Sequence, residues 1–140
     1  MRLAGWYSGT DGWLSVTLKA STPSGIILLA HGSRDPQWRA PMEAVAAHIL
    51  ARQPEIKVCC AYLELCAPSL TEAATDLIAS GARHIRIFPI FFGLGKHARE
   101  DLPRLLEQIR AAHPGVAIEL LPTAGEHEQL TLLMADIALR

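Results

Sequence analysis

The chain has 140 residues, of which 50% are apolar and 19% charged, with a formal net charge of −1. These values are typical of one globular domain that can build a core of its own. The balanced charge argues against a nucleic-acid binder, which usually carries a basic surplus, and no apolar run reaches the roughly 18 residues that a membrane span needs. We therefore expect no nucleic-acid partner and no membrane partner.

The first 22 residues differ from the rest of the chain. They carry Trp6 and Trp13 among scattered Gly and Ser residues, and they lack the apolar segment of a secretory signal. Residues 21–25, which are Ser, Thr, Pro, Ser and Gly, are typical of a linker. We predict that residues 1–22 are a flexible extension and that residues 23–140 form a single domain. The alternative is a short hairpin within residues 1–22 that packs on the domain or on a partner.

The cysteines indicate a reducing compartment. There are three of them, Cys59, Cys60 and Cys66, and the first two are adjacent in an apolar run. An odd number with this spacing makes a poor disulfide framework. We therefore expect reduced thiols and a cytoplasmic location.

From residue 26 onward, short apolar runs alternate with amphipathic segments. The runs predict four strands, at residues 26–30, 56–63, 84–90 and 116–121. Strand–helix units in succession indicate a parallel sheet covered by helices on both faces. With right-handed crossovers, we choose the flavodoxin-like strand order 2-1-3-4, an α/β three-layer sandwich.

Capping residues predict where the first two helices begin. Asp35 can cap a helix with Pro36 at its first position. Because Pro41 lies inside the same stretch, that helix either starts late or kinks there. The second helix opens at a capping box, residues 69–72.

The last two helices are predicted in the same way. Asp101 can cap the third helix, which would put Pro103 in its first turn, where a missing N–H costs little. A second capping box at residues 123–126 opens the fourth helix. Its core-facing stripe consists of Leu130, Leu133, Met134 and Ile137.

Three polar side chains follow strands that meet at one edge of this sheet. In an open α/β sheet, ligands bind beyond the carboxyl ends of the strands where the strand order reverses, here between the first and third strands. His31 follows the first strand, His97 follows the third, and Glu64 follows the second. Two imidazoles and a carboxylate suit a borderline divalent ion. Because a permanent structural site prefers four closed ligands, this incomplete set suggests an ion that is held briefly and passed on.

Each of these residues also has a plainer interpretation. His31 could be a loop residue bonded to backbone, and Glu64 a solvated carboxylate. His127 could contact a substrate or only begin a helix, and Cys66 could face the crevice or serve as a small buried apolar residue. The other histidines carry no prediction of function, since we expect His48 and His113 on helix surfaces and His84 at the opposite end of the sheet.

The loop before His97 is rich in glycine and aromatic residues. Gly93 and Gly95 lack the spacing of a dinucleotide-binding motif or a P-loop. Glycines there would let the backbone approach a large flat ligand, and Phe91 and Phe92 would offer it an apolar surface. The alternative for one of the two phenylalanines is a place in the core.

Taken together, three segments resemble the CbiX/SirB family of class II chelatases, which act on sirohydrochlorin. The segments are residues 28–35 (LLAHGSRD), 63–70 and 88–103, and the spacing matches over residues 25–140. The resemblance implies a chelatase-like fold, His31 and His97 as the metal-site histidines, and Glu64 as the acidic residue near them. It also implies the short form of the family, a homodimer with the active cleft between like domains. The N-terminal extension departs from the family pattern.

The resemblance implies a metal chelatase, a lyase of sirohaem or cobalamin biosynthesis. His31 and His97 would hold Co²⁺, Fe²⁺ or Ni²⁺, a substrate rather than a permanent cofactor, over one face of the macrocycle. Metal ligation needs neutral imidazole, so activity should fall below about pH 6. Glu64, or one of the histidines, would accept a pyrrole proton.

The remaining candidates would contact the macrocycle, with the cations paired to its carboxylates. They are Ser33, Arg34, Phe92, Gly93, Gly95, Lys96 and, less centrally, Arg99. Two other functions stay open from sequence alone. One is a non-catalytic carrier of metal or tetrapyrrole, and the other is a phosphohydrolase or mutase that uses His31 beside Arg34.

Overall fold

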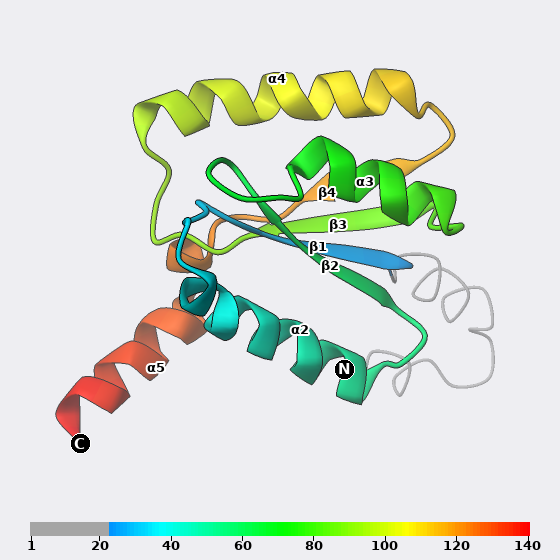
Figure 1. The fold of residues 1–140 in the computed structure, drawn as a ribbon. Coiled ribbons are helices and arrows are strands. Elements are labelled where there is room, and N and C mark those ends of the chain that lie inside the picture. The colour runs from blue at the N-terminus through cyan, green and yellow to red at the C-terminus, as the bar shows by residue number, and fades with distance from the viewer. Residues whose placement is uncertain (1–22) are drawn as a thin grey trace, which may run out of the picture.

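The computed structural model describes residues 23–140, so the predictions for residues 1–22 lie outside the described residues. Four parallel strands form one sheet in the order β2-β1-β3-β4 (Figure 1). The predicted strand order is therefore confirmed. The strands are β1 (Gly25–Ala30), β2 (Lys57–Tyr62), β3 (His84–Pro89) and β4 (Ala117–Leu120).

Strand β1 forms the centre of the core because it is apolar on both faces. It pairs with β2 on one side and with β3 on the other, and Ile27, Leu28 and Leu29 are almost completely buried. A strand with helices over both faces needs a continuous apolar run, which is what residues 26–30 supply.

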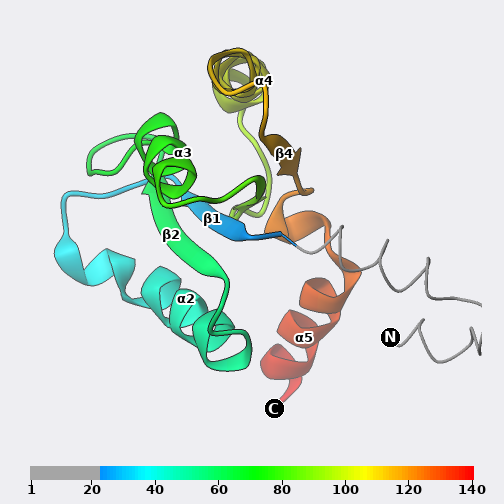
Figure 2. The same cartoon turned by 90° about the vertical axis from the view of Figure 1, so that its right-hand side faces the viewer.

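Helices lie on both faces of the sheet (Figure 2). α3 (Leu70–Ala79) and α4 (Lys96–Ala112) lie on one side, and α2 (Ala40–Arg52) and α5 (Glu128–Leu139) lie on the other. α3 begins at the predicted capping box, in which the Ser69 hydroxyl accepts from Glu72 N–H at 3.1 Å and the Glu72 carboxylate accepts from Ser69 N–H at 2.8 Å. The apolar positions of α3 and α4 pack on the larger of two core clusters, while α2 covers a smaller one.

The helix that contains Pro41 starts late and does not kink there, which confirms one of the two predicted alternatives. Asp35 caps a short 3-10 turn, η2 (Pro36–Arg39), by accepting from Gln37 N–H at 2.9 Å. α2 follows, with Pro41 in its first turn, where a missing N–H costs little.

The predicted start of the third helix is wrong. α4 begins at Lys96 with Gly95 as a purely backbone N-cap, so Asp101 is not a cap and Pro103 lies inside the helix. A glycine N-cap carries no side-chain signal, whereas Asp101 before Pro103 resembles a helix start. The consequence is that His97 lies in the first turn of α4.

The second capping box also opens a different element from the one predicted. Thr123 and Glu126 bracket a 3-10 turn, η3 (Ala124–Glu126), and α5 begins only after it, at Glu128. The stripe expected to face the core is largely uncovered, since no residue of α5 is buried. Figure 1 shows α5 slanting away from the carboxyl ends of the strands.

Two further properties concern the described residues as a set. None of their helices is long and apolar enough to cross a membrane. All three cysteines are free thiols, as the sequence predicts.

Candidate metal site

The turn after β1 holds His31 against the end of β2. The Glu64 N–H donates to the His31 carbonyl oxygen at 3.0 Å, and the Leu63 N–H donates to that of Ala30 at 2.9 Å. Gly32 completes the turn with a φ of 105°, and a Cβ at this position would collide with the Glu64 carbonyl. Only glycine fits both conditions, so the backbone fixes His31 and Glu64 as neighbours.

The segment after β3 brings His97 to the same end of the sheet. The Ile90 N–H donates to the Leu29 carbonyl oxygen at 2.8 Å, which extends the pairing of β3 with β1. The chain then turns through residues 91–95 and enters α4 at Lys96. Because α4 starts here, His97 lies on a helix rather than on a loop.

His31, His97 and Glu64 line one cavity of about 480 Å³. Gly95, Lys96 and Asp101 also line it, and the apolar part of its wall is Leu63, Ala98, Leu102 and Leu105. The two histidines lie 66 positions apart in the sequence, yet both face this hollow. Among residues 23–140, no three His, Cys, Asp or Glu side chains gather closely enough to enclose a metal ion. The cavity therefore offers separate donors on its walls rather than a closed set.

Asp101 is a further candidate, because it lines the same cavity and the sequence analysis did not assign it there. It is four positions after His97 on α4, and residues with this spacing share a helix face. The pattern was visible in the sequence, but it points to the site only if the helix begins at Lys96 and not at Asp101.

A second cavity, of about 600 Å³, meets the first at His31. The His31 ring packs on Phe91 with 4.5 Å between ring centroids, and the wall includes Trp38 and Phe92. The other lining residues are Ile90, Gly93, Ala124, Leu130 and Met134. Phe91 is buried and Phe92 is 74% exposed, so one phenylalanine belongs to the core and the other to the rim. Nothing in the sequence pointed to Trp38, Leu130 or Met134 as residues near the site.

Other candidates lie away from these cavities. Ser33 and Arg34 line neither of them, and the Ser33 hydroxyl accepts from Asp35 N–H at 3.0 Å. Arg99 lines a smaller hollow of about 310 Å³ beside Gly93. The His127 ring packs edge-on against Phe88 with 5.4 Å between ring centroids, and its Nε2 lies 3.2 Å from the Pro122 carbonyl oxygen. These contacts belong to the start of α5, where His127 is the N-cap.

His84 and His48 lie where the sequence predicts, whereas His113 follows the end of α4 instead of lying on a helix surface. His84 is at the amino end of β3 and approaches Glu119 at 3.3 Å. His48 is exposed on α2, and His113 is the half-buried C-cap of α4. None of them lines the two cavities that share His31.

Burial makes two thiols poor candidates for metal ligands. Desolvation raises the pKa of Cys59, and it also raises the pKa of Cys60. The thiolate is the form that binds metal, so both side chains are protonated at neutral pH. Burial likewise raises the pKa of Tyr62 to about 12, which keeps its hydroxyl neutral.

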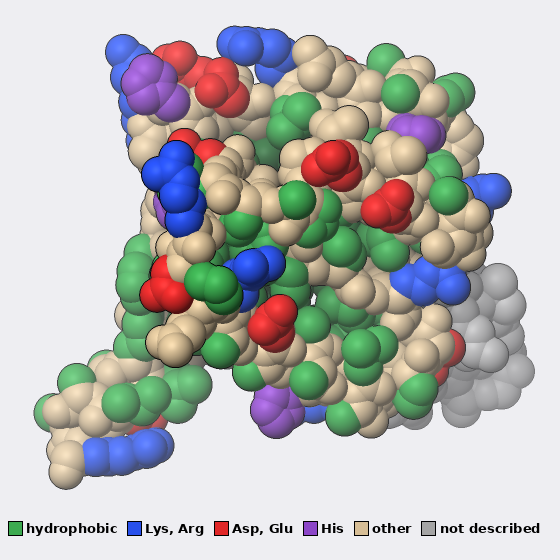
Figure 3. Space-filling view, viewed as in Figure 1, with side chains coloured by type: hydrophobic (Ala, Val, Ile, Leu, Met, Phe, Trp, Pro, Cys, Tyr) green, Lys and Arg blue, Asp and Glu red, His purple; other side chains and the backbone are tan. Residues whose placement is uncertain are grey.

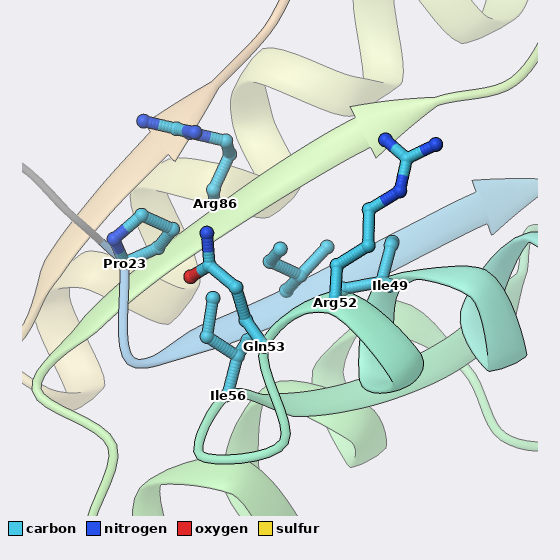
Figure 4. A pocket seen from close by; sticks show the side chains of 7 residues that line it. Pro23, Ile49, Arg52, Gln53, Ile56 and Arg86 are labelled. Atoms are coloured by element: carbon cyan, nitrogen blue, oxygen red, sulfur yellow. The ribbon is translucent and has the colours of Figure 1, made fainter. Parts of the chain in front are cut away.

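A hollow of about 350 Å³ lies on the α2 face of the sheet, at the opposite end from the histidines (Figure 4). Its floor is apolar, and the side chains of Arg52, Gln53 and Arg86 stand around it. The Arg86 guanidinium is already engaged, because its Nε donates to Glu119 at 3.0 Å. None of the residues that line this hollow is a candidate metal ligand.

Comparisons with known proteins agree on the family. The CbiX family model matches residues 25–138. The sirohydrochlorin cobaltochelatase of Saccharolobus islandicus (strain L.S.2.15 / Lassen #1) is 34% identical over 101 residues, 69% of this chain and 77% of the relative. That of Sulfurisphaera tokodaii is 30% identical over 112 residues, 80% of this chain and 88% of the relative.

Solved structures share the fold. A cobalamin (vitamin B12) biosynthesis CbiX protein from Marinobacter aquaeolei VT8 superimposes with a TM-score of 0.71 at 33% identity, over 82% of this chain and 93% of that one. The sirohydrochlorin chelatase SirB from Bacillus subtilis subspecies spizizenii, in complex with cobalt, gives 0.65 at 24% identity over 81% of this chain and 50% of that one. The second match shows the fold alone. The family match over residues 25–138, together with relatives of similar length, shows that this chain belongs to the CbiX family.

Proposed function

We propose that this chain is a sirohydrochlorin chelatase that inserts a divalent metal ion into the macrocycle. The observation that carries the proposal is the cavity into which both His31 and His97 face. The names of the relatives in Saccharolobus islandicus and Sulfurisphaera tokodaii support the same reaction.

The two imidazoles would act on the metal, which is a substrate here. Insertion requires the ion to lose water, and nitrogen ligands from His31 and His97 would replace water on one side of it while leaving the other side open. Such partial coordination favours release, because the macrocycle supplies its own nitrogens as the protein ligands leave.

The carboxylates would act on the protons. Two N–H protons leave the macrocycle as the metal enters, and a nearby base lowers the barrier to their transfer. Glu64 is our proposed acceptor. Asp101 lines the same cavity and is a second acceptor, one that sequence reasoning had not considered.

The macrocycle would lie across His31, where the two cavities meet. The aromatic wall of the second cavity suits a flat apolar ring, and Lys96 at the first suits a peripheral carboxylate. Phe92, Gly93 and Gly95 line one or the other cavity. Contacts from Ser33, Arg34 and Arg99 stay predictions.

Cobalt is the metal that we propose first. The two short relatives are named as cobaltochelatases, and their lengths match this chain more closely than SirB does. Fe²⁺ and Ni²⁺ are the alternatives, since two histidines accept all three ions. Competition between the metals on the purified protein would decide among them. A homodimer and a cytoplasmic location belong to the same proposal.

The test is an anaerobic absorbance assay with sirohydrochlorin and Co²⁺. We expect catalytic loss of the metal-free spectrum with the wild-type chain. Loss of an outer-shell partner of a metal ligand already costs 10–100-fold, so His97→Ala should lose at least about 100-fold in insertion rate. The fold should be retained because His97 is exposed.

His48→Ala is the matched control, since His48 is an exposed helical histidine on α2, away from the cavity. Unchanged turnover in His97→Ala would defeat the site assignment. Binding of metal or tetrapyrrole without turnover by the wild-type chain would make it a carrier. Hydrolysis of phosphate esters that needs His31 would make it a phosphohydrolase.

A further inference from the structure

Leu65 holds a strained backbone conformation in the loop that joins β2 to α3 (Figure 1). Among residues 23–140 it is the one residue other than glycine with a positive φ, which is 70°. The Cys66 N–H donates to the Glu64 carbonyl oxygen at 2.9 Å, so Leu65 is the middle residue of a γ-turn. A γ-turn with positive φ is rare and strained, and this one directly follows Glu64.

The packing on either side explains why the chain turns here. Leu63 packs against the larger core cluster and Cys66 against the smaller one, so the chain must cross between them within a few residues. The Tyr62 N–H donates to the Pro68 carbonyl oxygen at 2.9 Å, which closes the base of the loop. These contacts require a tight turn, but glycine would make it without strain.

The side chain of Leu65 does not explain why the residue is a leucine. It is 50% exposed, and it lines neither of the two cavities that share His31. Hydrophobic side chains reach the surface elsewhere on the molecule as well (Figure 3), so exposure alone carries no argument. Position 65 differs from those others because a residue with a Cβ occupies a conformation that favours glycine.

A Cβ narrows the backbone conformations that this turn can adopt. A residue other than glycine is confined at positive φ to a small left-handed region, whereas glycine has a much wider range. Strained residues of this kind cluster at functional sites, where the surrounding structure holds them. Here the neighbour is Glu64, whose N–H donates to the His31 carbonyl oxygen at 3.0 Å and which lines the metal-site cavity.

We propose that Leu65 is a positioning residue that fixes the direction of Glu64 at the site. The hydrogen bond to His31 holds one end of Glu64, and the narrow turn at Leu65 holds the other. Glycine would allow the same turn but would let Glu64 swing. The inference rests on the proposed function, in which Glu64 accepts a proton from the macrocycle and must lie within hydrogen-bond reach of it.

The first test compares Leu65→Ala with Leu65→Gly in the full 140-residue chain. Both variants remove the side chain beyond Cβ, so the difference between them reports the backbone. Alanine is the more stable of the two at an ordinary helical position, and the order reverses at positive φ. We therefore expect the urea midpoint of Leu65→Gly to lie above that of Leu65→Ala.

Leu50 is the matched control, since it is 42% exposed on α2 and lines neither cavity at His31. Leu50→Ala should be more stable than Leu50→Gly. If alanine is also the more stable residue at position 65, the turn is not strained and the inference is wrong.

The rate of metal insertion should follow the opposite order. Leu65→Ala keeps the narrow turn and should stay close to the wild-type rate. Leu65→Gly should fall to about one-tenth of it, the smaller of the losses typical of an outer-shell partner. The loss should appear in kcat and not in KM for sirohydrochlorin, because Leu65 lines neither cavity. An equal loss in Leu65→Ala would make the side chain a direct contact and overturn the proposal.

Glu64→Gln provides a readout that a merely structural role would not change. If Leu65 acts through Glu64, adding Leu65→Gly to Glu64→Gln should slow insertion no further. Losses that multiply would mean that the two residues act independently, and this would overturn the proposal, as would unchanged turnover in Glu64→Gln.

The two levels of the proposal fail in different ways. An inactive wild type would defeat the proposed function and the role of Leu65 with it, although the urea midpoints would still report the strain. An active wild type whose Leu65→Ala and Leu65→Gly variants insert metal at equal rates would defeat the role of Leu65 alone.

Discussion

At the scale of single residues, Gly32 connects backbone geometry to the site. Its φ is positive, and any side chain there would meet the Glu64 carbonyl. We expect Gly32→Ala to cost about 1–3 kcal/mol of unfolding free energy, as strain at such positions does. Insertion activity should fall too, because His31 and Glu64 flank the disturbed turn. Urea unfolding and the absorbance assay measure the two effects.

Gly115→Ala is the control for this variant. Gly115 follows α4 at the far end of the helix, its φ is not positive, and a Cβ there would meet nothing within 4 Å. Stability within about 0.5 kcal/mol of wild type is expected for such a surface change. Equal losses in the two variants would mean that the turn at Gly32 has no special role.

Glu119 gives a prediction about pH. The hydrogen bond from Arg86, aided by His84, lowers the pKa of the Glu119 carboxyl below its usual value. A lowered pKa in the folded state means that the ionised form stabilises the fold above the ordinary glutamate range, near pH 4.3, and that this stabilisation is lost as the pH falls through the folded-state value. Since the side chain is 41% exposed, the gain should stay below about 1 kcal/mol.

Chemical denaturation of wild type and Glu119→Gln at pH 7 and again at acid pH measures this gain. The wild type should be the more stable at pH 7, and the difference should shrink toward acid pH. A difference that is constant across this range would show that the carboxylate charge contributes nothing.

At the scale of elements, the strands were predictable and some helix starts were not. A parallel strand that is buried on both faces must be apolar, so residues 26–30 stand out in the sequence. Helix starts depend on caps, and a cap made only by backbone leaves no trace. Gly95 caps α4 in this way, which is why Asp101 was mistaken for the start and its place in the site was missed.

The capping box of α3 gives a prediction at the same scale. Ser69→Ala removes the hydroxyl that accepts from Glu72 N–H, and this should cost about 1 kcal/mol. Insertion should be unchanged because α3 lines neither cavity at His31. Ser80→Ala, at the other end of α3, is the comparison and should cost less. An equal loss would mean that the Ser69 capping box contributes no more to stability than the single hydrogen bond of the Ser80 hydroxyl to the Asp76 carbonyl.

At the scale of the whole molecule, the site joins segments that only the fold brings together. Sequence reasoning placed His31, His97 and Glu64 at one edge, because carboxyl ends of parallel strands meet there. It gave no hint of Trp38, Leu130 and Met134, whose contribution depends on how η2 and α5 lie against the sheet. Such packing depends on residues distant in the chain, so no local pattern records it.

Removal of residues 1–22 tests the predicted domain division. The family match begins at residue 25, and the sheet begins at Gly25. We expect a chain that starts at Pro23 to keep the melting temperature and the insertion rate of the full chain. A lower melting temperature would instead favour the hairpin that packs on the domain.

The turn at Gly125 affects which positions would lose function when they are mutated. A side chain at that position would press on the Phe92 backbone, and Phe92 lies five residues ahead of His97 in a single connecting stretch. A side chain at position 125 would therefore displace the segment that leads to His97. A random mutagenesis screen that scores only loss of metal uptake would flag position 125 alongside the histidines, although that position has no donor atom to offer an ion.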